Sequence, residues 1–130
     1  MKEKLEEILK NAYAPYSKYQ VACIIKMNND EEYSGVNVEA GSLKSGLCAE
    51  QVAIAAAVAE GYSKSDFKEL HVMGSGEKIT FPCFLCRQLL LEFFSLDAQI
   101  YSYNKKGEVK IVSLKELTPH AFVYEEVNHD

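Results

Sequence analysis

The sequence predicts an α/β domain in which helices cover both faces of a mixed β-sheet. Segments of β-favouring residues alternate along the chain with segments whose apolar residues recur at helical spacing. Residues 52–59 are apolar on nearly every face, which is typical of a helix buried on most sides. A length of 130 residues suits one domain with a core and is too short for two. We therefore expect a single domain over residues 1–130.

The first elements are a helix and a hairpin. Apolar residues at helical spacing predict an amphipathic helix over residues 2–12, and Pro15 prevents it from continuing. Residues 21–27 and 33–38 are rich in β-favouring types and flank the turn sequence Asn28-Asn29-Asp30. These two segments predict a β-hairpin.

The second predicted helix carries the buried apolar run. Residues 41–46 predict a loop, and Ser45 is a candidate N-cap for a helix that begins just before Cys48. Gly61 follows Glu60 and predicts the end of that helix. We expect this helix to lie at the centre of the fold.

The C-terminal half supplies the rest of the sheet. Residues 70–73 predict a short core strand, and Pro82 predicts the start of a leucine-rich helix. Two further strands are expected over residues 100–103 and 109–112, followed by a helical turn over residues 113–117. Together with the hairpin, these segments predict about five strands.

The composition excludes several classes of function. The formal net charge is −5, whereas binding to a nucleic acid depends on clustered Lys and Arg. No apolar run approaches the roughly 20 residues needed to cross a bilayer, and the N-terminus lacks the pattern of an export signal. The sequence therefore predicts a cytoplasmic protein with no membrane or nucleic-acid partner and a small-molecule substrate.

Two short segments predict a catalytic zinc site. Cys48-Ala49-Glu50 and Pro82-Cys83-Phe84-Leu85-Cys86 supply three thiolates and one carboxylate. Structural zinc usually has four protein ligands, whereas catalytic zinc has three and leaves one position open. Cys83 and Cys86 are three residues apart and therefore share one face of a helical turn. Cys48 and Glu50 are two residues apart, so on a helix they would point to nearly opposite sides and could not hold a metal alongside it. The metal is therefore expected beyond the helix N-termini, where the backbone N–H groups favour anions.

The same residues suggest a reaction. The zinc deaminase signature joins a His-or-Cys, any residue, Glu element to a Pro-Cys-x-x-Cys element, and its glutamate transfers protons without binding the metal. This pattern assigns Glu50 as the general acid and base beside a zinc-activated water. Two alternatives remain open at this point. One is a structural zinc knuckle completed by His71 or His120, and the other is a redox-active Cys83/Cys86 pair.

The chain as a whole resembles the small, homotetrameric, three-cysteine cytidine deaminases. The resemblance covers almost its full length and includes the segments Tyr13–Val21, Gly35–Glu39, Ala59–Gly61 and Cys86–Gln88. It implies a three-layer α/β/α cytidine deaminase-like fold and one Zn²⁺ per chain. It also implies hydrolytic deamination of cytidine and 2′-deoxycytidine for pyrimidine salvage, in a homotetramer with active sites near the subunit interfaces.

The resemblance also implies substrate-binding residues. Asn37 and Glu39 would hydrogen-bond the ribose hydroxyls, Tyr19 would stack on the pyrimidine, and Phe122 would reach the site of a neighbouring subunit. Without the resemblance, Asn37 would be interpreted as a turn residue, Glu39 as a solvated side chain, and both aromatics as core residues. The remaining cysteine, Cys23, is predicted to be a small buried hydrophobe.

Three departures from the family pattern bear on the substrate. Gln51 stands where the family has an arginine that offsets the charge of the thiolates, so the compensation would fall to Arg87 or the helix ends. Ala40-Gly41-Ser42-Leu43 and Phe84-Leu85 make the rim of the pocket more apolar, which would admit bulkier aminopyrimidine nucleosides. Two alternative functions follow: a deaminase of a modified nucleoside such as blasticidin S, and a noncatalytic zinc-binding assembly protein.

Overall fold

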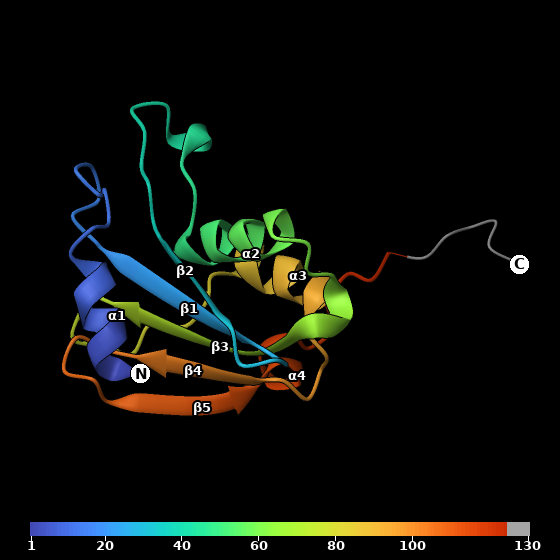
Figure 1. Cartoon of the computed structure of the whole chain (residues 1–130). Helices are drawn as coiled ribbons and strands as arrows, with labels where there is room; N and C mark the ends of the chain where they lie inside the picture. Colours follow the sequence, from blue (N-terminus) through green and yellow to red (C-terminus); the bar gives the residue numbers. More distant parts are fainter. Residues whose placement is uncertain (125–130) are drawn as a thin grey trace, which may run out of the picture.

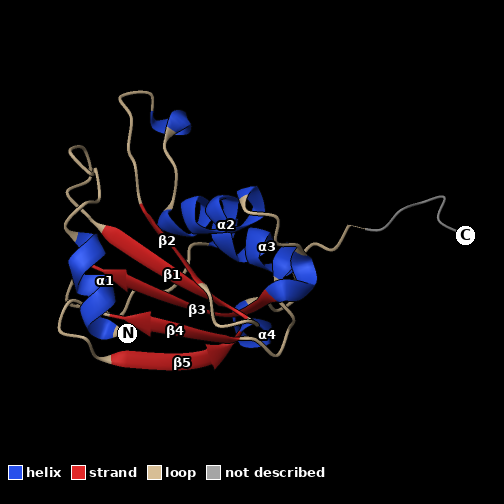
Figure 2. Ribbon diagram, viewed as in Figure 1, coloured by secondary structure: helices blue, strands red, loops and turns tan. Residues whose placement is uncertain are grey.

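The computed structural model describes residues 1–124. Helices and a five-stranded sheet form three layers, as Figures 1 and 2 show. The elements are α1 (Lys2–Leu9), β1 (Val21–Met27), β2 (Glu32–Val36), η1 (Leu43–Ser45), α2 (Ala49–Ala59), η2 (Lys64–Asp66), β3 (Phe67–Gly74), α3 (Phe84–Phe93), β4 (Gln99–Tyr103), β5 (Val109–Ser113) and α4 (Leu114–Leu117). The prediction of an α/β fold with about five strands is confirmed.

The sheet is mixed. Its strand order is β2-β1-β3-β4-β5. The pair β3/β4 is parallel, whereas β1/β2, β1/β3 and β4/β5 are antiparallel. The parallel pair requires a crossover, which the chain makes through α3. This crossover places α3 on the same face of the sheet as α2 (Figure 1).

Each face of the sheet has its own apolar core. Along β1, Ala22 and Ile24 pack with Leu5 of α1, whereas Cys23 and Ile25 point to the opposite face. The alternation follows from the two-residue period of a strand. The larger core contains buried residues of α2, α3 and α4, so helices cover both faces as predicted. Cys23 is fully buried in that core and is the small hydrophobe that the sequence predicts.

The glycine at position 35 allows α2 to lie directly on the sheet. A Cβ at Gly35 would lie 2.6 Å from the backbone nitrogen of Ala53 and 2.9 Å from the Cβ of Val52. Such distances are closer than Cβ atoms normally approach other atoms, so only glycine fits without a shift of α2. The N-terminal turn of α2, which carries Glu50, is therefore held at a fixed height above β2.

The structure corrects several element boundaries. The strand predicted over residues 33–38 ends at Val36, and the helix predicted to start at Pro82 begins at Phe84. The first helix ends at Leu9 and gives way to a turn, instead of continuing to residue 12. The strand predicted over residues 70–73 extends over Phe67–Gly74. Ser45 is not an N-cap, because it lies in η1 and Cys48 itself caps α2. No helix within residues 1–124 is both long enough and apolar enough to cross a bilayer.

Candidate metal centre

Cys48 occupies the N-cap of α2. Its backbone is extended (φ −78°, ψ 154°), which is the usual N-cap conformation. Its N–H donates to Oε1 of Gln51 at 2.7 Å, an arrangement that forms half of a capping box. Gln51 thus fixes the backbone of Cys48, and the thiol projects beyond the end of the helix.

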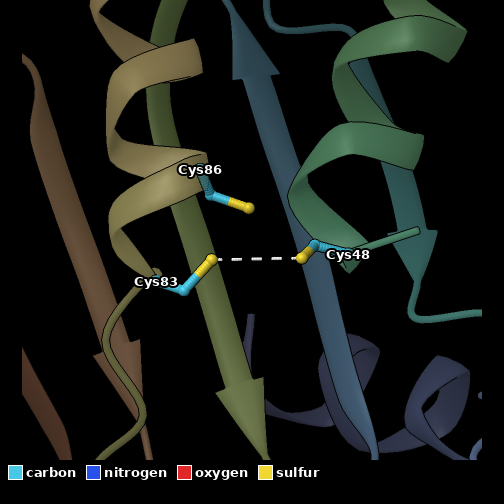
Figure 3. A group of neighbouring side chains, drawn as sticks. All are labelled: Cys48, Cys83 and Cys86. Carbon is cyan, nitrogen blue, oxygen red and sulfur yellow. Dashed lines mark hydrogen bonds between the residues drawn. The ribbon is translucent and has the colours of Figure 1, made fainter. Parts of the chain in front are cut away.

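The other two cysteines lie at the N-terminal end of α3. Cys83 is its N-cap and is exposed, whereas Cys86 lies in the first turn and is fully buried. Figure 3 shows the three cysteine side chains converging between the N-terminal ends of α2 and α3. The three thiols therefore meet at the N-terminal ends of the two helices, as the spacings of Cys48 with Glu50 and of Cys83 with Cys86 predict.

The cluster fits a tetrahedral metal. The three Sγ atoms lie within 4.8 Å of one another, and the Cys48 and Cys83 Sγ atoms are 4.0 Å apart. Thiolates bound to zinc at about 2.3 Å in tetrahedral geometry would be roughly 3.8 Å apart. All of these cysteines are free thiols, and within residues 1–124 no fourth ligand joins the group. Three soft ligands with one position open suit a catalytic zinc ion.

The structure does not support a zinc knuckle completed by His71. That imidazole is 4% exposed, and its Nδ1 and Nε2 atoms hydrogen-bond Tyr103 Oη at 2.9 Å and Glu69 Oε2 at 2.7 Å. Tyr103 packs in the core on the α1 face, whereas the cysteine cluster lies at the N-termini of α2 and α3. His120 is likewise outside the ligand group.

Glu50 is a buried carboxyl beside the metal ligands. It lies in the first turn of α2 and is 4% exposed. Burial raises the pKa of Glu50 to about 7, and the nearby Cys48 thiolate adds to this shift. A carboxyl with such a pKa both accepts and donates a proton near neutral pH.

Arg87 is engaged away from the thiolates. Its Nε donates to the Pro82 carbonyl at 2.6 Å and its Nη1 to the Leu117 carbonyl at 3.2 Å, while the guanidinium stacks on Phe84. It therefore ties the start of α3 to the end of α4. A hydrogen bond from Cys86 lowers the pKa of the Cys48 thiol to about 6. With Arg87 so engaged, the N-termini of α2 and α3 are the groups that favour negative sulfur.

A cavity of about 840 Å³ opens beside the cluster. Cys48, Cys83 and Glu50 line one part of it, and Asn37 and Glu39 line another. Its remaining lining includes the apolar side chains of Leu43, Leu47 and Leu85, which are all well exposed. The pocket thus combines a metal-binding end, a polar end and an apolar rim.

The polar end is already ordered by hydrogen bonds. Asn37 Oδ1 accepts the Val21 N–H at 2.9 Å, and its Nδ2 donates to the Tyr19 carbonyl at 2.9 Å. The Glu39 carboxylate accepts hydrogen bonds from the 16–17 turn. These bonds, led by the one from the Ser17 hydroxyl, hold the pKa of Glu39 below its usual range. Both side chains keep further hydrogen-bonding capacity for a ligand.

The two aromatic candidates lie in different places. Tyr19 lines the cavity and is 38% exposed. Phe122 is not among the residues that line this cavity. Its ring is 69% exposed, and its carbonyl accepts a hydrogen bond from Gln88 Nε2 at 2.9 Å. The structure therefore brings Tyr19, Asn37, Glu39, Glu50, Cys48 and Cys83 together around one pocket, with Cys86 buried behind it, and leaves Phe122 outside it.

The sequence analysis assigns no role to two further residues at the pocket. Ser17 and Thr80 both line it, and each hydrogen-bonds a candidate substrate-binding side chain. Their partners are 22 and 61 residues away in the chain, so no local spacing indicates either contact.

The chain matches one family model over residues 1–102, described as the cytidine and deoxycytidylate deaminase zinc-binding region. A cytidine deaminase from Mycoplasma genitalium is 37% identical over 120 residues, covering 92% of this chain and 91% of the relative. A cytidine deaminase from Halalkalibacterium halodurans is 32% identical over 117 residues, covering 90% and 87%.

Solved structures give the same result. A crystal structure of cytidine deaminase from Burkholderia pseudomallei superposes with a TM-score of 0.88 at 32% sequence identity. The match covers 92% of this chain and 94% of that one. The similarity therefore extends over nearly the whole of both chains.

Proposed function

The chain belongs to the cytidine and deoxycytidylate deaminase family, and we propose that it hydrolyses cytidine and 2′-deoxycytidine to uridine and 2′-deoxyuridine with release of ammonia. One observation carries the proposal. Three cysteine thiols converge at two helix N-termini, and a buried carboxyl with a pKa near 7 lies beside them on the wall of an open cavity. Thiol redox chemistry has no use for that carboxyl, whereas hydrolytic deamination needs it.

Each residue has a separate task in the reaction. Cys48, Cys83 and Cys86 would hold the zinc ion. When bound, zinc supplies the acidity that makes water a nucleophile near neutral pH. Glu50 would take one proton from the attacking water and deliver it to the ring nitrogen while the water oxygen bonds to the target carbon. It would then move the proton of the new hydroxyl to the amine, which leaves as ammonia. The carbon–nitrogen bond then breaks, and the product carries a carbonyl in place of the amine.

The polar end of the cavity binds the sugar. Asn37 and Glu39 hydrogen-bond the ribose hydroxyls, since an amide and a carboxylate together donate to and accept from a hydroxyl pair. Tyr19, which also lines the cavity, stacks on the pyrimidine. The large volume and apolar rim also leave room for substituents on the base.

The assembly that we propose is a homotetramer in the cytoplasm, acting in pyrimidine salvage. The exposed apolar side chains at the rim, with Leu43 at 79% and Leu85 at 64% exposure, favour contact with other copies of the chain. Phe122, outside its own cavity, would then reach the site of a neighbouring subunit. Light scattering should give four times the chain mass of 14.6 kDa, and a monomer mass would contradict the assembly.

A substrate panel tests the proposed reaction. Zinc-replete protein is incubated with cytidine, 2′-deoxycytidine or blasticidin S, and ultraviolet absorbance and ammonia are followed together. Turnover of the two plain nucleosides is expected. Turnover of blasticidin S alone would assign the chain to a different substrate. Silence on all three, despite one bound zinc per chain, would contradict a catalytic role on these compounds.

A further inference from the structure

The turn over residues 14–18 is fastened to the strand extension that carries the candidate ribose-binding residues. Tyr13 and Val38 form a β-bridge. The Tyr13 N–H donates to the Asn37 carbonyl at 3.0 Å, and the Glu39 N–H donates to the Tyr13 carbonyl at 2.9 Å. The side chains of this turn are therefore held at a fixed distance from Asn37 and Glu39.

Within that turn, Ser17 makes two of the three hydrogen bonds to the Glu39 carboxylate. The backbone N–H groups of Tyr16 and Ser17 both donate to Oε1 at 3.0 Å, and the Ser17 hydroxyl donates to Oε2. An ionised carboxylate offers about four acceptor positions. Three are filled by the turn, which leaves one in a defined direction for a ligand hydroxyl.

The same hydroxyl also fixes Tyr19. Ser17 Oγ accepts a hydrogen bond from the Tyr19 N–H at 3.0 Å. The Ser17 hydroxyl therefore donates its single hydrogen to Glu39 and uses a lone pair to accept from Tyr19. The far end of the tyrosine is held as well, because its hydroxyl bonds Thr80 Oγ1. Gly76 allows the ring to lie close, since a Cβ there would be 2.9 Å from Tyr19 Cε1.

We propose that Ser17 is a positioning residue, which orients the Glu39 carboxylate for a ribose hydroxyl and couples that orientation to the Tyr19 wall of the pocket. The inference rests on the proposed function, in which Glu39 binds the sugar. A glutamate side chain that had to be ordered at each binding event would lose rotamer freedom, and that cost would weaken binding. Because Ser17 already holds the Glu39 carboxylate in place, this loss of rotamer freedom does not occur on binding.

The test compares Ser17→Ala with Ser17→Thr, which keeps the hydroxyl, and with Ser34→Ala, an exposed serine of β2 on which no part of the proposal depends. Each zinc-loaded variant is assayed on cytidine and on 2′,3′-dideoxycytidine, which lacks the 2′- and 3′-hydroxyls. The preference for cytidine, as the ratio of kcat/KM values, should fall about tenfold in Ser17→Ala, mainly through a higher KM for cytidine. It should persist in Ser17→Thr and Ser34→Ala.

Thr80→Val separates the effect of the hydrogen bonds on Glu39 from their effect on Tyr19. It removes the partner of the Tyr19 hydroxyl but leaves the bonds between Ser17 and Glu39 intact. Turnover of both nucleosides should fall by the same factor, so the preference for cytidine should not change. A drop in preference equal to that of Ser17→Ala would show that disorder of the pocket, and not Glu39 orientation, is responsible.

A carbon-13 NMR titration gives a readout that does not depend on activity. The pKa of the Glu39 carboxyl should be higher in Ser17→Ala than in the wild type and should stay low in Ser17→Thr. An unchanged pKa, or an unchanged preference in an enzyme that deaminates cytidine, would overturn the inference. If the wild type deaminates neither nucleoside, the proposed function fails, whereas the titration still decides whether Ser17 holds Glu39.

Discussion

At the scale of single residues, neighbouring side chains of the first turn of α2 have different tasks. Glu50 is buried beside the cysteine cluster, whereas Gln51 returns its Oε1 atom to the Cys48 N–H. Gln51 therefore stabilises the backbone of a metal ligand but brings no charge. Three thiolates on Zn²⁺ leave a net charge of −1, and Arg87 directs its hydrogen bonds to carbonyls of Pro82 and Leu117. The site relies on helix ends for compensation.

Replacing Gln51 by arginine tests this reliance. A cation beside the thiolates should raise kcat/KM for cytidine or change the rate at which a chelator removes zinc. The metal-free variant should also unfold more easily by about 1 kcal/mol, because the acceptor for the Cys48 N–H is lost. Gln99→Arg on the exposed end of β4 serves as the matched control. If neither activity nor metal retention changes, the site does not depend on residue 51.

How far the sequence predicts the site depends on the distance between partners along the chain. The metal ligands and Glu50 lie in two short motifs, so their spacing predicted both the ligand set and its place beyond the helix ends. Ser17 carried no such signal, because its partner Glu39 is 22 residues away and the contact exists only after the 14–18 turn docks on the strand. The resemblance suggested Asn37 and Glu39 as substrate-binding residues but not what orients them.

At the scale of elements, the site depends on where two helices begin. The sequence favoured Ser45 as the cap of α2, since serine is a strong N-cap residue. The structure places Cys48 there, because Gln51 supplies the reciprocal bond of a capping box from the third helical position. Capping by Cys48 aims its thiol beyond the helix end, whereas capping by Ser45 would have placed the cysteine within the helix.

The contact between α2 and β2 at Gly35 makes a second prediction. Gly35→Ala would place a methyl group 2.6 Å from the Ala53 nitrogen, so α2 must shift or the strand must bend. We expect a loss of about 1–3 kcal/mol in the free energy of unfolding and faster loss of zinc, because the Cys48 thiol moves with the helix. Chemical denaturation and chelator competition measure the two effects.

Gly41→Ala is the control for this substitution. Its Cβ would meet only the Tyr16 side chain, with the hydroxyl oxygen at 3.2 Å, and that side chain is exposed. Equal destabilisation by both substitutions would show that the contact of α2 with β2 is not specially close.

At the scale of the whole molecule, the face of the sheet under α1 holds a buried polar network. His71 stacks on Tyr101, with ring centroids 4.1 Å apart, and bonds Tyr103 and Glu69. Burial lowers the pKa of His71 below its ordinary value, although the hydrogen bond that His71 donates to the Glu69 carboxylate opposes the shift. The sequence predicted strands here but not this network, because its members are brought together by the pairing of β3 with β4.

The network makes stability depend on pH. Because the native pKa of His71 is lowered, the unfolded chain binds more protons as the pH falls through the ordinary value of 6.5. Its contribution to stability is therefore complete above that value and is lost as the pH falls below it. Denaturation from pH 7.5 to 5.5 should show a steeper loss in the wild type than in His71→Gln. His120→Asn, at an exposed position, should follow the wild type. Identical slopes of unfolding free energy against pH in all three proteins would exclude His71 as the cause of the pH dependence.

The fold class and strand order of the sheet are properties of the whole chain that the sequence predicted only in part. Alternating segments predicted helices on both faces, and the structure confirms this arrangement. The parallel pairing of β3 with β4 depends on contacts between distant segments, which local patterns do not encode. That residues 1–130 form one domain remains a prediction.

The most direct test of the central claim is the release of ammonia from cytidine by the zinc-loaded wild type and by Glu50→Gln, with bound zinc measured in the same samples. The wild type should release one ammonia per uridine formed. The variant should keep one zinc per chain, because Glu50 is not a ligand, and should lose about 10²- to 10⁴-fold in turnover, because the proton carrier is gone. A zinc-loaded variant that retains most of the wild-type rate would contradict the account of this site.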